Sequence, residues 1–131
     1  MSRNLKKIAC DKGSGIVGFV LVTPLVVAIF IAVGQIAILV ADKSVLNSAA
    51  VIGARTASAA DASNADGRSA VLNVLASRGA AFTPESINIT QVRNQGLTYI
   101  SVSVTRKVEI PFLGREFLMT GRSRAIDEAS L

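Results

Sequence analysis

The chain is divided by an uncharged apolar run that extends from Gly13 to Ala41, whereas charged residues occur both before and after it. A helix needs about 20 apolar residues to cross the roughly 30 Å hydrocarbon core of a bilayer, and this run is longer. A helix of this length in a soluble protein would normally show a polar face, and this one shows none. We therefore expect residues 14–41 to form one transmembrane helix that contacts membrane lipid.

The charges that flank this run predict its orientation. Four basic residues and one acidic residue precede it, whereas Asp42 and Lys43 cancel each other directly after it. The positive-inside rule then places the N-terminus in the cytoplasm and residues 42–131 outside. The expected location is the cytoplasmic (inner) membrane, crossed once.

The apolar run does not fit a cleaved secretory signal or a lipoprotein anchor. A secretory signal has an apolar stretch of about 7–15 residues, roughly half of this run. A lipoprotein anchor at Cys10 would need the apolar segment before the cysteine, but here it follows. A plain membrane anchor without special processing stays open as an alternative.

The composition excludes many kinds of chemistry. The 131 residues include no His and one Cys, so zinc sites with His ligands, His-dependent triads and internal disulfides are not available. The sequence also has no phosphate-binding loop, nucleophile elbow or calcium loop. Most of the net charge of +5 lies in residues 1–12 and not in the part expected to fold, which disfavours a nucleic-acid partner. We expect no enzyme activity, catalytic residue, metal, cofactor or small-molecule substrate.

Several residues of the run suggest contacts with other helices. Pro24 should kink the helix, a distortion that membrane helices tolerate when groups such as the Thr23 hydroxyl satisfy the backbone. Gly13, Gly15 and Gly18 permit close contact between helices, and Gln35 would prefer a partner helix to lipid.

The order of residues at the start of the run resembles a known layout. A short basic leader ends in Gly13, and the small residue Ser14 opens the apolar helix. Counted from Ser14, Phe19 is the sixth residue and Pro24 the eleventh. This layout resembles the opening of TadE-like pseudopilins of tight-adherence (Flp-type) pilus systems. The resemblance implies that residues 1–13 are a prepilin-type leader, cut after Gly13 by a prepilin peptidase.

A second match lies beyond the membrane. TadE-like proteins tend to have an Ala-Ala-x-x-Gly-Ala-Arg element soon after the span, and the corresponding residues here are Ala49, Ala50, Gly53, Ala54 and Arg55. The resemblance covers residues 13–55. It implies a structural minor pilin that assembles with other pilins or pseudopilins of the same system. The alternative is a single-pass anchored binding or sensing module without prepilin processing.

One residue departs from the pilin pattern. The fifth position after the leader is usually Glu in pilins, where it is thought to pair with the free amine of a neighbouring subunit, but here it is Gly18. A subunit at the tip, or one that primes assembly, has no earlier amine to neutralise. This departure therefore suggests a tip or priming role.

Residues 42–60 are expected to continue the helix as a stalk. The segment is rich in Ala, the best helix former, so we expect it to protrude without a full core of its own. Its predicted apolar stripe consists of Val45, Ala49, Ile52 and Thr56. A break is expected at Asp61–Gly67, where Asn, Asp and Gly cluster.

A second helix and three strands are expected in the small extracytoplasmic domain, residues 61–131. The helix should begin near Asp66 and stop at Gly79. Its predicted buried face consists of Val71, Leu72, Leu75 and Ala76.

The strands are predicted from alternating apolar and polar residues at 87–93 and 99–110, with a turn at Asn94–Gly96 between them and a third strand at 116–125. The predicted inward residues of the second strand are Ile100, Val102, Val104, Val108 and Ile110. Arg106 interrupts this apolar side, marking a bulge or a point where the sheet leaves its cover. Residues 126–131 are expected to be a frayed tail. The fold class is α+β: a long, pilin-like N-terminal transmembrane helix, then a small helix and a three-stranded antiparallel sheet.

Overall fold

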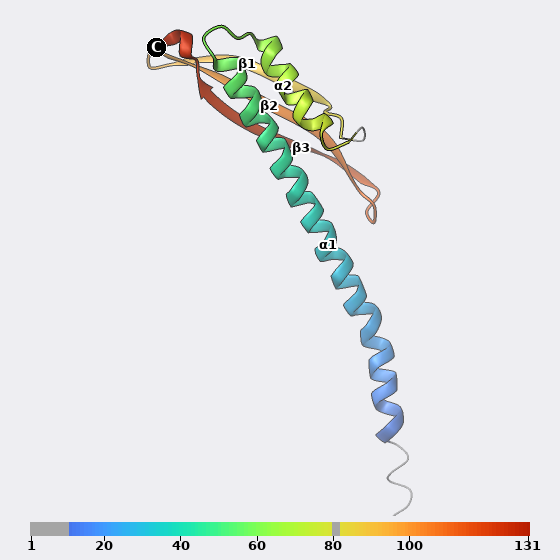
Figure 1. Cartoon of the computed structure of the whole chain (residues 1–131). Helices are drawn as coiled ribbons and strands as arrows, with labels where there is room; N and C mark the ends of the chain where they lie inside the picture. The colour runs from blue at the N-terminus through green and yellow to red at the C-terminus, as the bar shows by residue number, and fades with distance from the viewer. Residues whose placement is uncertain (1–10, 80–81) are drawn as a thin grey trace, which may run out of the picture. The chain divides into compact units, whose positions relative to one another are not determined.

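The computed structural model describes residues 11–79 and 82–131. Their elements, in chain order, are α1 (Asp11–Ser58), α2 (Asn64–Ala76), β1 (Ser86–Asn94), β2 (Leu97–Ile110), β3 (Arg115–Ile126) and a short 3-10 helix, η1 (Glu128–Ser130) (Figure 1). The predicted α+β class is confirmed. The chain divides into two compact units, the first ending at Ile38 and the second beginning at Leu39.

In the first unit, α1 is long and apolar enough to cross a membrane. Its most apolar window has a mean hydropathy of 2.9, and none of that window is buried by other described residues. The helix is continuous through Pro24. The Thr23 hydroxyl donates a hydrogen bond of 2.7 Å to the Phe19 carbonyl, next to the Val20 carbonyl that Pro24 cannot serve. The Thr23 hydroxyl, expected to satisfy the carbonyl freed by Pro24, thus donates to the carbonyl one residue earlier.

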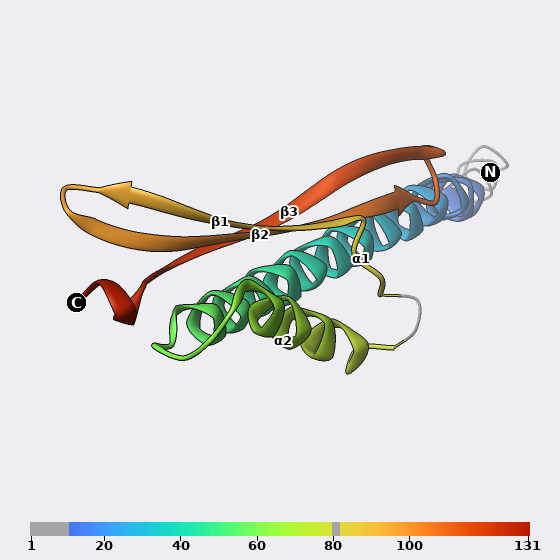
Figure 2. The same ribbon diagram turned by 90° about the horizontal axis from the view of Figure 1, so that it is seen from above.

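In the second unit, the sheet has the order β1-β2-β3 and is antiparallel throughout. Figure 2 shows the sheet as one layer and α2 as part of the other. The first hairpin closes with a two-residue turn, Gln95 and Gly96, whose φ angles are 50° and 86°. Two positive φ angles belong to a type I′ turn, which matches the twist of the flanking strands. The predicted turn is confirmed.

The central strand, β2, has the predicted alternation. Ile100, Val102, Val104 and Val108 are buried, and Lys107 and Glu109 between and beyond them are exposed. The pairing with β3 is continuous from Tyr99 to Ile110, so a bulge at Arg106 is wrong. Arg106 instead lies one residue beyond the end of the pairing with β1, where only β3 flanks the strand.

The core of the second unit is centred on the α1 segment that follows the apolar run. Its buried residues form two adjacent rows, Val45, Leu46, Ala49, Ala50, Gly53, Ala54, Ala57 and Ser58. The expectation that this segment stands without a core of its own is therefore wrong. Ile52, expected in the apolar stripe, is 43% exposed. The buried rows differ from the expected stripe because the small residues, not the largest aliphatic one, permit close approach.

The second helix, α2, begins earlier than expected. Ser63 is its N-cap, and a reciprocal capping box with Asp66 ends the preceding break at Ser63. The helix is followed by Gly79, whose φ is +112°, a conformation typical of a helix stop. Gly67, Val71 and Leu75 are buried, which confirms two of the four predicted inward residues. Leu72 and Ala76 are exposed, because the buried face follows steps of four that begin at Gly67.

The C-terminal residues are held against the sheet, so the prediction of a frayed tail is wrong. The Asp127 amide donates a hydrogen bond of 2.8 Å to the Thr98 carbonyl. The Thr98 amide in turn donates to the Ser130 hydroxyl at 3.4 Å. The Asp127 side chain also caps η1 by accepting from the Ala129 amide. These bonds hold the short helix η1 against the start of β2.

Candidate functional site

The first candidate surface is the apolar part of α1 in the first unit. Its exposed large side chains are Ile16, Val17, Phe19, Val20, Leu21, Val22, Leu25, Val26, Val27, Ile29, Phe30, Ile31, Val33, Ile36 and Ile38. A contiguous apolar surface of this extent marks a membrane or protein interface. At about 25 cal/mol per Å² of apolar area, leaving it in water would be very unfavourable. Lipid or the apolar helices of partners must therefore cover it.

Gly13, Gly18 and Phe19, three predicted site residues of this unit, occupy open positions. Gly13 and Ser14 lie in the first turn of α1, so the bond between them belongs to the helix start. A Cβ atom added to Gly13 or Gly18 would meet no atom within 4 Å. Phe19 is exposed, and Gln35 is partly buried. The structure lines these residues along one helix and does not gather them into a pocket.

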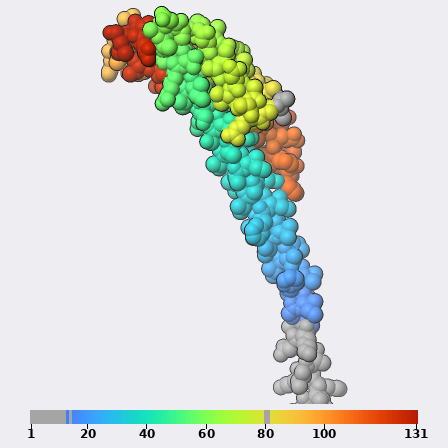
Figure 3. All heavy atoms as spheres, viewed as in Figure 1, coloured from blue at the N-terminus to red at the C-terminus, as the bar shows by residue number. Residues whose placement is uncertain are grey.

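In the second unit, two glycines allow α1 and α2 to touch. A Cβ atom on Gly53 would lie 2.3 Å from a methyl group of Val71. One on Gly67 would lie 2.6 Å from the Ala57 Cβ and 2.9 Å from the Gly53 carbonyl oxygen. The two helices pack without a gap between them on the face shown in Figure 3, where the green end of α1 borders the yellow-green α2. Any side chain at either glycine would push the helices apart.

A third glycine allows the sheet to approach α1 closely. A Cβ atom on Gly121 of β3 would lie 2.4 Å from the Leu46 carbonyl carbon and 2.7 Å from the Asn47 nitrogen. These are backbone atoms, which cannot rotate away. Neither Gly67 nor Gly121 is predicted from the sequence as a contact residue. A glycine inside a strand often marks a close approach of another backbone, and that signal was present at Gly121.

The family-like motif after the span lies in this packed region. Ala49, Ala50, Gly53 and Ala54 are all buried, and Arg55 is exposed in the last turn of α1. The four small residues therefore serve the packing of the second unit, which leaves Arg55 as the motif residue that is open to a partner.

Polar contacts join the part of α1 that opens the second unit to the sheet. Asp42 accepts a hydrogen bond of 2.9 Å from the Arg106 guanidinium, and both side chains are only about one-fifth exposed. The same guanidinium lies 4.0 Å from the centre of the Phe82 ring, a cation–π contact. The Lys43 ammonium donates to the Thr120 carbonyl. The residue that seemed to interrupt the apolar side of β2 thus pairs with the first charged residue after the apolar run.

One carboxyl group of the second unit has a shifted pKa. The backbone amide of Ser63 and then its hydroxyl donate hydrogen bonds to the Asp66 side chain, and they lower its pKa below the ordinary value of 3.8. Both bonds favour the charged carboxylate. Their role is to cap α2.

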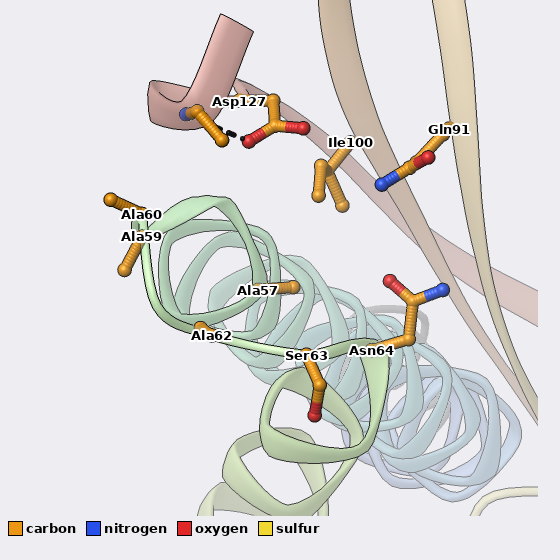
Figure 4. A pocket seen from close by; sticks show the side chains of 10 residues that line it. Ala57, Ala59, Ala60, Ala62, Ser63, Asn64, Gln91, Ile100 and Asp127 are labelled. Carbon is orange, nitrogen blue, oxygen red and sulfur yellow. Dashed lines mark hydrogen bonds between the residues drawn. The ribbon is translucent and has the colours of Figure 1, made fainter.

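A shallow hollow of about 450 Å³ lies at the end of α1 (Figure 4). Alanines line much of it, and Ser63, Asn64, Gln91 and Asp127 supply its polar side chains. The Asp127 carboxylate already accepts a bond from the Ala129 amide. Within residues 11–79 and 82–131, no group of three or more Cys, Asp or Glu side chains could hold a metal ion. The hollow offers no arrangement of acid, base and nucleophile.

Comparison with known proteins adds one finding. Residues 13–55 match the family described as TadE-like protein. No curated protein and no solved structure matches the chain. The matched stretch contains both the apolar surface of α1 and the small residues that pack the second unit. TadE-like proteins are structural, pilin-like components related to pilus assembly. The resemblance inferred from the sequence is confirmed in that residues 13–55 of this chain match the TadE-like family.

Proposed function

We propose that this protein is a processed, non-enzymatic pilin-like subunit for assembly of a tight-adherence type pilus. The observation that carries the proposal is the exposed apolar surface of α1 within the stretch that matches the TadE-like family. Such a helix can exchange lipid contacts for packing against the helices of other subunits. Small residues with open space around them, such as Gly15 and Gly18, favour that packing.

The proposal includes the orientation and the processing of the chain. The basic residues before the apolar run favour an N-terminus in the cytoplasm, with the second unit outside. A prepilin peptidase would then cut between Gly13 and Ser14 on the cytoplasmic side. The partners after this step are other pilins or pseudopilins of the same system.

The role at the tip or in priming rests on Gly18. A Cβ atom at this position would meet no atom within 4 Å, so the chain has room for a larger residue. The missing carboxylate is therefore not explained by steric exclusion within this chain. A charged group in a membrane helix is costly and normally has a partner. A subunit that begins assembly has no earlier subunit to provide one.

The test is the intact mass of the protein made with and without an active prepilin peptidase. We expect the mature protein to lack residues 1–13 only when the peptidase is present. Gly13→Ala should abolish that loss, and the matched control Gly15→Ala, which also has open space, should not. An unchanged mass with an active peptidase would refute processing. It would favour a permanently anchored module that displays the second unit for binding or sensing.

A further inference from the structure

The turn between β2 and β3 exposes two large apolar side chains side by side. Phe112 is 74% exposed and Leu113 is 67% exposed. Figure 3 shows this turn, in orange, at the surface of the second unit. Single exposed apolar residues are common, but an adjacent aromatic and aliphatic pair at the tip of a hairpin suggests an apolar contact.

The direction of the hairpin can be read from its contacts with α1 inside the second unit. Val102 of β2 lies against Gly53, and Arg106 of β2 binds Asp42. The helix advances about 16 Å from Gly53 back to Asp42, at 1.5 Å per residue. The strand advances about 13 Å between Val102 and Arg106, at 3.3 Å per residue. The two elements thus run alongside each other in opposite chain directions.

β2 does not stop at the level of Asp42. It continues from Arg106 to Ile110, about 13 Å further at 3.3 Å per residue, and the turn follows. Figure 1 shows this turn at the end of the sheet remote from the C-terminus. Asp42 is the first charged residue after the apolar run, and Leu39–Ala41 in the same unit are the last residues of that run. The turn therefore lies on the membrane side of Asp42.

We propose that the β2–β3 turn is a second membrane contact, in which Phe112 and Leu113 enter the lipid interface. The headgroup layer on each side of a bilayer is roughly 5–7 Å thick. If Asp42 lies a few Å outside the headgroup layer, a hairpin that extends about 13 Å beyond it keeps Glu109 and Glu116 within that layer and carries the turn just through it. Apolar side chains of this kind insert about 5–10 Å into the boundary between headgroups and acyl chains. The proposal depends on the membrane span and not on the role in pilus assembly.

Most backbone amides of the turn are hydrogen-bonded or absent, which favours its insertion into lipid. Pro111 has no N–H group, and the amides of Leu113 and Gly114 both donate to the Ile110 carbonyl at 3.1 Å. Three of the four turn residues therefore bring no unsatisfied amide into a medium without water.

The charged residues next to the turn limit its depth. Arg115 pairs with Ile110 at the base of the turn, where its long side chain can reach lipid phosphate. Glu109 and Glu116 lie opposite each other one pair further up and are exposed. These carboxylates are expected to stay among the headgroups, so only the turn itself goes deeper.

The chain contains no Trp, so one introduced Trp is a unique fluorescent reporter. The full-length chain carrying Phe112→Trp is reconstituted into vesicles whose acyl chains are brominated near the headgroups. We expect bromine to remove most of its emission, and we expect an emission maximum blue-shifted from that of Trp in water. Leu113→Trp should behave in the same way and guards against a local effect of one substitution.

Two reporters serve as controls in the same vesicles. Val92→Trp lies in β1, close to the hairpin at the opposite end of the sheet, and should keep its emission. Phe30→Trp lies in the span and should be quenched by bromines placed deeper in the acyl chains. If the Phe112 and Leu113 reporters matched the Val92 reporter while Phe30 was quenched, the turn would not touch lipid and this inference would be wrong. A contact made only with another subunit would give that result. If Phe30 also kept its emission, the span would be refuted, and this inference with it.

Discussion

Both parts of α1 have apolar side chains, but these side chains are exposed in the first part and mostly buried in the second. Before Leu39 the helix has large aliphatic and aromatic side chains on all sides, and they are exposed. From Val45 onward, two rows of the helix are buried, and most of their residues are Ala or Gly. The two parts differ in the size and arrangement of their apolar residues, and the second part also has polar residues, such as Asp42, Lys43 and Arg55, outside its buried rows.

Each part of the helix is suited to a different kind of contact. Large side chains around the whole circumference suit lipid, which adapts to any shape. Rows of small residues instead let two backbones approach, and the contact is then specific to the partner's shape. In the second unit that partner is the chain's own sheet and α2, as the close approaches at Gly53, Gly67 and Gly121 show. Single substitutions can test this division of roles.

The largest effect is expected from Gly121→Ala. The new methyl group would lie 2.4 Å from the Leu46 backbone, so either the sheet or the helix must move. Overpacking of this kind costs about 1–3 kcal/mol and occasionally more, and we expect the upper end because backbone atoms are involved. Chemical denaturation of the full-length chain in detergent, followed by the circular dichroism of the sheet, measures the loss.

Gly34→Ala is the matched control for this change. A Cβ atom at Gly34 would meet no atom within 4 Å, so the second unit should keep its unfolding midpoint. Equal midpoints for the two variants would mean that β3 does not approach α1 as described. The division between an open and a closely packed part of the helix would then be wrong.

The open part of the helix is tested by Gly18→Glu. The structure has room for the larger side chain, so we expect the subunit to insert into the membrane, at a cost below the roughly 3 kcal/mol known for a charge at the centre of a span. If the protein primes assembly, the added carboxylate should lower the number of pili started and should not raise the amount of subunit found inside filaments. Pilus counts per cell and quantitative immunoblots of sheared filaments measure both.

Gly18→Gln has nearly the same shape without the charge and serves as the control. The priming role would be refuted if Gly18→Glu increased incorporation into filaments while initiation stayed unchanged.

A smaller effect is expected where the closely packed part of α1 begins. Asp42→Asn removes the charge that binds Arg106, from a pair whose side chains are about 20% exposed. Largely exposed pairs contribute about 0.2–1 kcal/mol, and we expect a loss near 1 kcal/mol here because the pair is partly buried. Glu85→Gln breaks the more exposed pair with Lys107, 3.5 Å apart, and should have almost no effect. Equal effects in denaturation experiments would show that Asp42 does not fix the helix to the sheet.

The Asp42–Arg106 pair also illustrates how far sequence reasoning reaches. Local patterns predicted the long apolar helix, the turn at Gln95 and Gly96, and the alternation of β2, because each depends on neighbours along the chain. Contacts between distant segments were missed. Arg106 interrupts an alternating strand, and only the folded chain shows that Asp42, 64 positions away, is its partner.

The same limit accounts for the wrong expectations. The buried rows of α1 were misjudged at Ile52 because polarity alone does not show which face a sheet will cover. The C-terminal residues looked unstructured because their bonds go to Thr98, a residue far away in the sequence. For the candidate site, the motif from Ala49 to Arg55 was found from the family resemblance, but its buried position depends on packing with the sheet.

The smallest effect is expected from the N-cap of α2, the helix that packs against α1 in the second unit. The Ser63 amide and hydroxyl lower the pKa of Asp66, so the folded chain binds this proton more weakly than the unfolded chain does. The resulting stability is fully present above the unfolded pKa of 3.8 and is lost as the pH falls through the lower, folded pKa. An NMR titration of the Asp66 carboxyl should give a midpoint below 3.8, and Ser63→Ala should raise it only part of the way, because the backbone amide still donates. A midpoint at or above 3.8 in the unmodified protein would show that the capping box does not form, and that α2 is held by its contact with α1 alone.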